Sequence, residues 1–365
     1  MAKAPIYDAS LIGKKQSVVD EILLLNPHQT PLLNLIGFAE PVTQTTHQWF
    51  EDEIYADESK VNGSVLVGGT AIVVVDVEPF RVGHVVKVAD ELIYVSAINT
   101  GTKTLTVTRG YASTTAAAIA DQAKIEVQFV EGAEGADART ARYKARTSKS
   151  NYTQIFDDSV QISGSAEAIT QYGISDLYEY EKQKKQIELA LSLEKAVING
   201  VAYQNGQVRQ MSGIRSFIQT NVADAQGAAI DGTKLNDSLQ SIYEKGGFAS
   251  GGNFKIMVPA KQKRAISALD ANKILISQSE NSRGQVVDHF VSDFGQFEII
   301  LNNNLDAKEA LIVDVNRVAI RPLASRDFFH MYMGQQGDYK TGMLVGEYTL
   351  ELNQEKAHAR IKGLA

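Results

Sequence analysis

Short apolar runs separated by turn residues fill residues 64–130. The runs are rich in valine and isoleucine, and turn signals such as Gly83 and the stretch NTGT stand between them. They cover residues 71–77, 85–89, 91–98, 103–108 and 124–130. Strands this short and this closely spaced predict a compact β-sandwich or barrel-like unit.

A helical pattern of apolar positions covers residues 175–199. Ser175 or Asp176 is expected to cap its start, and Gly200 stands just past its end. At 1.5 Å per residue the helix would be roughly 36 Å long. The pattern therefore predicts one long helix that lies on the surface and buries a single face.

The expected buried stripe of this helix consists of Leu177, Tyr180, Ile187, Leu191 and Ile198. Glu181 and Lys185 stand one turn apart, so we expect them to pair on the exposed face.

Two extended segments flank the β-unit, an outgoing one at 43–59 and a returning one at 137–153. On the outgoing segment Glu51 and Glu53 share a face. The basic residues that share one face of the returning segment are Arg142, Lys144 and Arg146. If the segments pair as an antiparallel ribbon, opposite charges across it contribute about 0.2 to 1 kcal/mol per pair. The β-unit would then be an insertion within a ribbon.

The remaining chain shows a mixed pattern. Residues 1–19 are polar and predict an arm, and two short helices are expected before residue 42, the second beginning at Thr30 and Pro31. After the long helix, helices near 235–245 and from Pro259 onward alternate with strands. The expected strands cover 254–258, 286–301 with a break at Gly295, 309–315 and 317–323. We expect one mixed domain from these elements, and C-terminal strands that return to the long helix.

Composition narrows the class of protein. The 365 residues exceed what one simple core usually fills, and a net charge of -7 disfavours tight, sequence-blind binding of nucleic acid by the whole surface. The absence of cysteine excludes disulfides, thiolate metal sites and cysteine nucleophiles. The N-terminal stretch lacks the apolar core of a secretory signal, and no apolar run approaches the length that spans a bilayer. A packed cytosolic product is expected.

No motif in the sequence predicts catalysis, and we expect no catalytic, cofactor-binding or metal-binding residues. The six histidines never fall at the spacing of a zinc site. The stretch around Ser165 lacks the second glycine of a nucleophile elbow, and Gly68 and Gly69 precede a strand, the wrong order for a phosphate loop. The stretches at Asp57 and Asp224 lack the alternating oxygen ligands of a calcium loop.

The strongest charge feature is a basic run made of Arg139, Arg142, Lys144, Arg146 and Lys149. Three interpretations are open: contact with an acidic neighbouring subunit, a plain solvated ribbon, or contact with a polyanion. Only Tyr143 and Tyr152 stand near it as stacking platforms, so the first interpretation is favoured over nucleic-acid binding.

Several stretches resemble one protein family. They are RQMSGIRSFIQT at 209–220, VSDFGQFEIILNNNL at 291–305 and GEYTLELNQEKAHARIKGL at 346–364. Together with the order of arm, ribbon, long helix, mixed domain and C-terminal strands, they resemble the major capsid proteins of tailed bacteriophages with the Hong Kong 97-type fold. FRVGHVVKV and LTVTRGYASTTAAA in the β-unit resemble a pattern in several phage structural proteins, from which His84, Ser113 and Thr114 depart.

The resemblance implies an α+β fold with named parts. They are an N-terminal arm with docking helices at 1–42, an extended loop at 43–155 that carries an inserted all-β module at 64–130, a peripheral domain at 156–204 with a spine helix at 175–199, an axial domain at 205–322, and C-terminal strands of the peripheral domain at 323–365. The extended loop is expected to lie over the adjacent subunit.

The resemblance also implies a function. The chain would be a non-enzymatic component of the virion that assembles, in the cytoplasm of the bacterial host, into an icosahedral shell of hexamers and pentamers around double-stranded DNA. Expected partners are a separate scaffolding protein, a portal and a decoration protein. The scaffolding protein is expected to be separate because the chain has no room for a scaffolding segment ahead of its arm. Contact with DNA would be weak and non-specific, and no contact with membrane is expected. Some relatives form a lysine–asparagine crosslink, but no matching motif supports one at Lys60 and Asn62.

Two alternatives remain open on the sequence. One is the shell of a cellular nanocompartment that encloses a protein cargo. The other is a phage tail or adhesion protein whose β-module binds host glycans.

Overall fold

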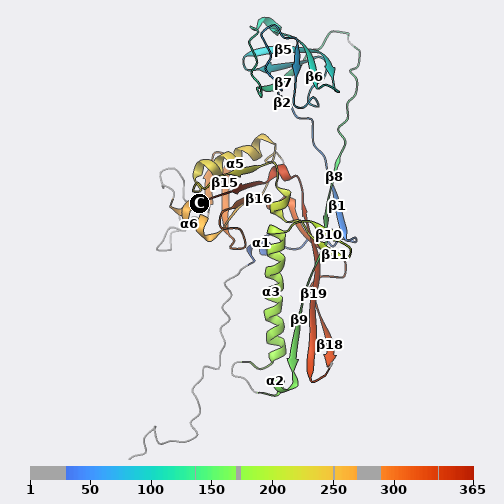
Figure 1. Ribbon diagram of the computed structural model, residues 1–365, viewed down its shortest axis with the longest axis vertical. Coiled ribbons are helices and arrows are strands. Elements are labelled where there is room, and N and C mark those ends of the chain that lie inside the picture. The colour runs from blue at the N-terminus through green and yellow to red at the C-terminus, as the bar shows by residue number, and fades with distance from the viewer. Residues whose placement is uncertain (1–29, 136, 170–173, 250, 269–288, 336) are drawn as a thin grey trace, which may run out of the picture. The chain divides into compact units, whose positions relative to one another are not determined.

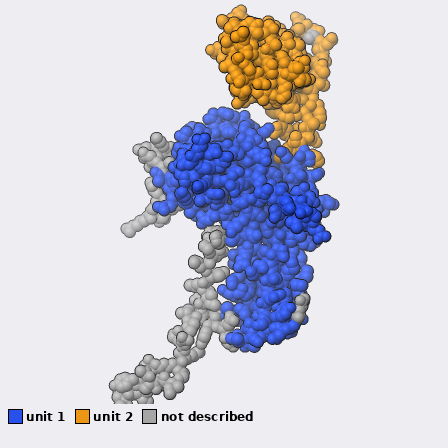
Figure 2. Space-filling model, viewed as in Figure 1, with its two compact units in different colours: residues 1–49, 148–365 blue, residues 50–147 orange. Residues whose placement is uncertain are grey.

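The computed structural model describes residues 30–135, 137–169, 174–249, 251–268, 289–335 and 337–365. The chain divides into two compact units, residues 1–49 with 148–365 and residues 50–147 (Figure 2). The expected arm at 1–19 and the first short helix lie outside the described residues. Within the described residues no helix is long and apolar enough to cross a membrane.

Residues 58–130 in the second unit form one six-stranded sheet (Figure 1). Its strands are β2 (Glu58–Lys60), β3 (Ala71–Val73), β4 (His84–Val88), β5 (Glu91–Asn99), β6 (Thr104–Thr108) and β7 (Lys124–Val130). Every hydrogen-bonded pair in the order β2-β7-β4-β5-β6-β3 is antiparallel. The sheet closes over its own apolar core, which includes Val61, Ile72, Val86, Ile93, Leu105 and Ile125. We call residues 58–130 the β-module.

The ribbon is shorter than its sequence suggests. β1 (Thr46–Glu51) and β8 (Thr147–Tyr152) form a two-stranded sheet, whereas 137–146 contain no strand among the described residues. The Thr153 N–H donates to the Thr45 carbonyl and the Thr147 hydroxyl to the Glu51 carbonyl, so the strands are antiparallel. Beyond them the two segments are joined by side-chain contacts, such as that of Lys144 with Glu53, rather than by strand pairing.

A four-stranded sheet packs on the long helix in the first unit. Its strands are β9 (Gln154–Ser163), β17 (Val318–Pro322), β18 (Phe329–Gln335) and β19 (Tyr339–Leu352). β19 pairs antiparallel with the other three, so this strand lies at the centre of the sheet. Helix α3 (Leu177–Asn199) runs beside β9 and β19 (Figure 1). Side chains of both elements share one core, which includes Phe156, Val160, Leu189, Leu193, Leu344 and Leu350.

Helix α3 confirms the expected element and corrects its details. Asp176 is the N-cap and accepts hydrogen bonds from the Tyr178 and Glu179 backbone, as its position suggests. The buried residues are Leu189, Leu193, Glu194, Val197 and Ile198, so Ile198 of the predicted stripe is buried. Ile187, predicted to be buried, is 40% exposed, and Leu177, Tyr180 and Leu191 are half-buried. The C-terminal half therefore supplies the fully buried side chains of the helix, while Leu177 near its start also packs against the core.

The expected pair between Glu181 and Lys185 is wrong. Glu181 pairs with Lys184, while Lys185 reaches Glu188 at 2.8 Å and Asp158 of β9 at 3.0 Å. Lys185 therefore pairs with Asp158 on another element and with its helical neighbour Glu188, and not with Glu181.

The short helix α1 (Pro31–Ile36) begins at Thr30 as expected, but the Thr30 side chain makes no capping hydrogen bond. The fully buried Glu194 of α3 caps it instead, since its carboxylate accepts from the backbone N–H groups of Leu32 at 3.1 Å and Leu33 at 2.9 Å. A carboxylate at a helix N-terminus is favoured by the helix dipole. Burial raises the pKa of Glu194 against these hydrogen bonds.

A second, six-stranded sheet has the order β12-β20-β16-β13-β15-β14. The strands are β12 (Val222–Asp224), β13 (Phe254–Val258), β14 (His289–Ser292), β15 (Gly295–Leu301), β16 (Ala310–Asp314) and β20 (Ala359–Lys362). Helices α5 (Gly232–Glu244) and α6 (Ala260–Ser267) pack on it, and the core includes Leu235, Leu239, Ile256, Ile266, Ile312 and Ile361.

The expected division at residue 322 does not separate the two sheets. β17 pairs with β19 in the four-stranded sheet, although it was assigned to the mixed domain. β20 joins the mixed sheet between β12 and β16, although it was assigned to the C-terminal strands. Long-range strand pairing decides which sheet β17 and β20 join, and no local sequence pattern predicts that pairing.

Short elements complete the chain. In the part of the chain that the structure describes, they are the hairpin β10 (Tyr203–Asn205) and β11 (Val208–Gln210), helices α2 (Gly164–Ala168) and α4 (Ile214–Phe217), and 3₁₀ turns at Tyr111–Ser113, Val315–Arg317 and Glu355–Ala357.

Candidate functional site

The structure does not gather the histidines into a site. His47 meets the Glu351 carboxylate at 2.9 Å, His330 meets the Tyr178 hydroxyl at 2.8 Å, and His358 is fully buried. His28 lies outside the described residues. Among the described residues no group of three His, Asp or Glu side chains is arranged to hold a metal ion.

The basic run is partly neutralised by its own unit. Lys144 Nζ lies 3.6 Å from the Glu53 carboxylate and 3.7 Å from that of Glu78, and Arg146 lies 3.4 Å from Asp52. The pairing of Lys144 with Glu53 follows from the predicted ribbon. Such half-exposed pairs contribute little energy, on the order of 0 to 1 kcal/mol, but they hold the two chain segments together.

The other basic residues of the run are placed differently. The Arg142 guanidinium donates to the Pro79 carbonyl at 3.0 Å and lies 4.1 Å from the centre of the Tyr55 ring. Arg139 and Lys149 are exposed, and neither forms an ion pair within the described residues. The residues of the basic run therefore lie in three different environments and do not form one charged face.

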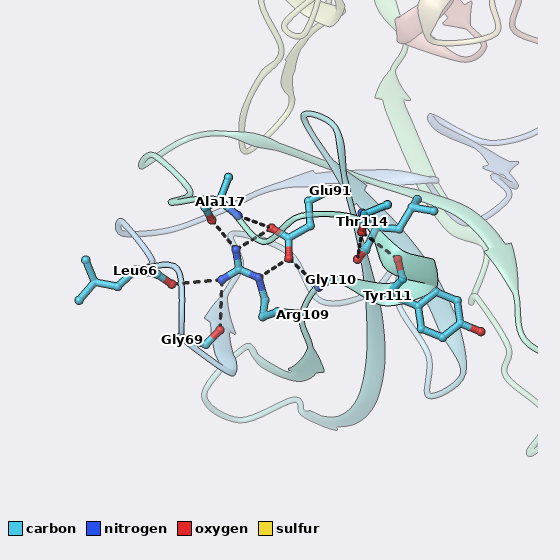
Figure 3. A network of polar contacts seen from close by, with 9 residues as sticks. Leu66, Gly69, Glu91, Arg109, Gly110, Tyr111, Thr114 and Ala117 are labelled. Atoms are coloured by element: carbon cyan, nitrogen blue, oxygen red, sulfur yellow. Dashed lines mark hydrogen bonds and ion pairs between the residues drawn. The ribbon is translucent and has the colours of Figure 1, made fainter.

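Inside the β-module, the stretch around Arg109 forms a closed polar network (Figure 3). Arg109 makes a bidentate pair with Glu91, with Nε 2.7 Å and Nη2 2.6 Å from the carboxylate oxygens, and it also donates to backbone carbonyls of two loops. The Glu91 side chain is 2% exposed and accepts from the backbone of Gly110 and Ala117 as well. Burial alone raises the pKa of Glu91, but these hydrogen bonds outweigh it and the pKa lies below its usual value. Arg109 is thus a structural clamp.

The departures at His84 and Thr114 lie in different environments, and Thr114 has a structural role. The Thr114 hydroxyl accepts from the Leu92 backbone N–H at 3.1 Å and donates to the Tyr111 carbonyl at 2.8 Å, which fixes the loop against β5. His84 is 3% exposed, and its Nδ1 has no hydrogen-bond partner. Burial, together with the charges of Arg142, Arg81 and Arg139, lowers the pKa of His84 to about 4.

Two of the three stretches that carry the family resemblance, the first and the last, meet at two buried carboxylates. Glu347, of the last stretch, accepts from Arg209 at 2.9 Å and from Arg326 at 2.8 Å. Arg215 and Arg360, from the first and last stretches, both donate to Glu309 at 2.6 Å.

Asn302, from the middle stretch, donates to Glu194 at 2.7 Å. These contacts join elements that lie far apart in the sequence.

Comparison with known proteins agrees with this arrangement. The model of the SU10 major capsid protein family matches residues 6–365. The chain belongs to this family.

A curated relative, the major capsid protein of Escherichia phage Phieco32, is 23% identical over 210 residues, which are 57% of this chain. The match spans 55% of that relative, little more than half of its length.

Solved structures show the same fold at low identity. The capsid of a native GTA particle aligns over 98% of both chains with a TM-score of 0.53 and 9% identity. A structure from Mycobacterium phage Bobi aligns over 96% of both chains with a TM-score of 0.53 and 11% identity. The fold is the Hong Kong 97-type capsid fold, of class α+β, as the resemblance implied.

In this capsid-family chain, β18 is an edge strand that exposes large apolar side chains, because among the described strands it pairs with β19 alone. Phe329 is 36% exposed, Met331 49%, Tyr332 56% and Met333 45%. Exposed apolar edges are aggregation-prone in a monomer and are usually covered in an assembly. The sequence analysis missed this surface, although the aromatic and methionine-rich run FFHMYM was visible.

Proposed function

We propose that the chain is the major capsid protein of a tailed bacteriophage and self-assembles into the icosahedral head shell that encloses double-stranded DNA. The observation that carries the proposal is the match of a single capsid family across residues 6–365. The exposed edge of β18 supports it, since this strand has free backbone groups and apolar side chains for a neighbouring subunit.

The chain can be divided into the parts that the capsid fold implies, with two changes to the expected domain boundaries. We assign α3 as the spine helix, the four-stranded sheet with α3 as the peripheral domain and the β12–β16 and β20 sheet as the axial domain. Residues 43–155 are the extended loop and carry the β-module. The sheets rather than a single boundary in the sequence define the two domains, because β17 and β20 each cross the expected boundary.

The shell would consist of hexamers and pentamers assembled in the host cytoplasm. A separate scaffolding protein, a portal and a decoration protein are proposed partners. Contact with DNA would be weak and non-specific, since the net charge of the chain is -7. No catalytic role is proposed.

Electron microscopy of the purified assembly tests the function. Closed icosahedral particles that contain DNA when isolated from infected cells are the expected result. Particles filled with a protein cargo would instead favour a nanocompartment, and monomers or trimers that bind cell surfaces would favour an adhesion protein. Shells of native size from the chain expressed alone would contradict the need for scaffolding.

Deletion of residues 64–130, with the ribbon rejoined, tests the role of the β-module. Loss of shells would make the module an assembly element. Shells that form but lose thermal stability or a bound decoration protein would make it an external clamp.

A further inference from the structure

One surface of the second unit, formed by the β-module and the returning segment at 139–142, combines uncompensated positive charge with exposed apolar side chains. Arg81 is half-buried and Arg139 exposed, and no ion pair joins either, or Arg142, to a carboxylate within the described residues. The contrast with the rest of the module is clear, since Arg109 and Lys124 both have carboxylate partners at 2.6 Å. Three guanidinium groups without a counter-charge leave an anion-attracting field.

The buried His84 lies among these guanidinium groups, whose charges all act on its ring. Its Nδ1 is a buried polar atom with no partner, an arrangement that ordinarily costs stability unless a ligand or partner satisfies it. The His84 backbone donates to the Arg81 carbonyl at 3.1 Å, so the turn that presents Arg81 also places the imidazole.

Apolar side chains lie on the strands around His84. Val130 is its direct cross-strand partner and is 39% exposed, Phe129 pairs with Val85 and is 49% exposed, and Val82 is 53% exposed. An apolar centre with arginine around it is the usual composition of a protein–protein interface. Glu131, which follows Val130, accepts a hydrogen bond from the Tyr111 hydroxyl and raises the pKa of Tyr94 through a hydrogen bond.

We propose that this surface, made of Arg81, Val82, His84, Phe129, Val130, Arg139 and Arg142, binds an acidic segment of a second copy of the chain. A second copy is the occupant favoured by charge, because the chain carries 43 acidic against 36 basic residues and the module keeps these arginines unpaired. The inference rests on the proposed function and adds which face of the module contacts a neighbour and by what chemistry.

A charge-matched pair of variants tests it in the full-length chain. Arg81→Gln with Arg139→Gln removes two positive charges from the surface, and Lys60→Gln with Lys87→Gln removes two from exposed lysines elsewhere in the module. We expect the first variant to raise the critical concentration for shell assembly about tenfold and to flatten its dependence on salt, while the second behaves as wild type. Equal behaviour of the two variants would overturn the inference.

A conservative variant identifies the occupant. Arg139→Lys keeps the charge and supplies an amine that a carbodiimide joins to a nearby carboxylate. In shells assembled from a mixture of isotopically light and heavy chains, we expect position 139 to crosslink to Asp or Glu of a differently labelled copy. Crosslinks confined to one chain, or to a decoration protein, would overturn the inference while leaving the proposed function intact. Failure of the wild-type chain to form particles even in the presence of its scaffolding protein would instead overturn the proposed function, and this inference with it.

Discussion

The β-module and the main unit, which is the first unit of residues 1–49 with 148–365, differ in how far apart along the chain their paired strands lie. In the module β4, β5 and β6 follow one another and pair in that order, and β5 joins β6 through a short turn. In the main unit β9 pairs with β19, so that Gln154 meets Tyr348 across almost two hundred residues. The sheet of the module therefore forms from residues within 50–147, whereas the sheets of the main unit need strands from the C-terminal part of the chain.

Each region also buries a histidine, and the two differ in the hydrogen bonding of their ring nitrogens. His358, in the main unit, accepts the Asp314 N–H at Nδ1 and faces the Asn353 carbonyl at Nε2, so that the neutral ring is satisfied on both sides. His84, in the module, has an unpartnered Nδ1. The comparison indicates that His358 is a structural residue and that His84 stands at a surface still missing a partner.

The largest effect is expected from Arg109→Ala. Removal of the guanidinium leaves the Glu91 carboxylate buried without its counter-charge, at a cost of about 3 to 5 kcal/mol. Differential scanning calorimetry should show the transition of the module moving to lower temperature while that of the main unit stays in place. Lys124→Ala, which breaks an exposed pair with Glu58, serves as the control and should shift neither transition appreciably. A joint shift of both transitions would show that the units unfold together.

The next effect is a dependence on pH in the main unit. The pKa of His358 is lowered by burial from 6.5 to about 4, so the unfolded chain takes up the proton first. Its contribution to stability is complete above pH 6.5 and is lost as the pH falls from 6.5 towards 4, a loss of about 3 kcal/mol at most.

His358→Asn should therefore reduce the slope of unfolding free energy against pH in that window, measured by urea denaturation at each pH. Comparison with His289→Asn, at a half-buried histidine, removes the general effect of losing a histidine. An unchanged slope in His358→Asn would contradict the assignment.

A smaller effect is expected at the junction of α3 with the segment before α4. A Cβ at Gly213 would lie 2.6 Å from the Gly200 nitrogen and 2.8 Å from the Ala196 carbonyl oxygen, which are backbone atoms that have little room to move. Gly213→Ala should destabilise the main unit by about 1 to 3 kcal/mol in thermal unfolding. Gly101→Ala in the module meets only the Asn99 side chain, at 3.5 Å, and should be close to neutral. A neutral Gly213→Ala would mean that the close approach is not required.

The sequence predicted the parts of the molecule whose contacts are local. Five strands of the β-module, the N-cap of α3 at Asp176 and the strand at 254–258 follow from apolar periodicity and capping chemistry alone. The pairing of Lys144 with Glu53 also follows, because two chain segments of opposite charge flank a single insertion. The capsid fold itself was predicted from recurring stretches rather than from periodicity, since no local rule distinguishes a capsid from other α+β proteins.

Only the tertiary structure decided which strands share a sheet and which charges meet. β17 and β20 exchanged the domains expected for them, Glu194 replaced Thr30 as the cap of α1, and Lys185 pairs with Asp158 of β9 beside its helical neighbour Glu188. In each case a partner far along the chain takes part. Propensity and periodicity act over a few residues, whereas burial and long-range pairing contribute more free energy and therefore decide the outcome wherever the two compete.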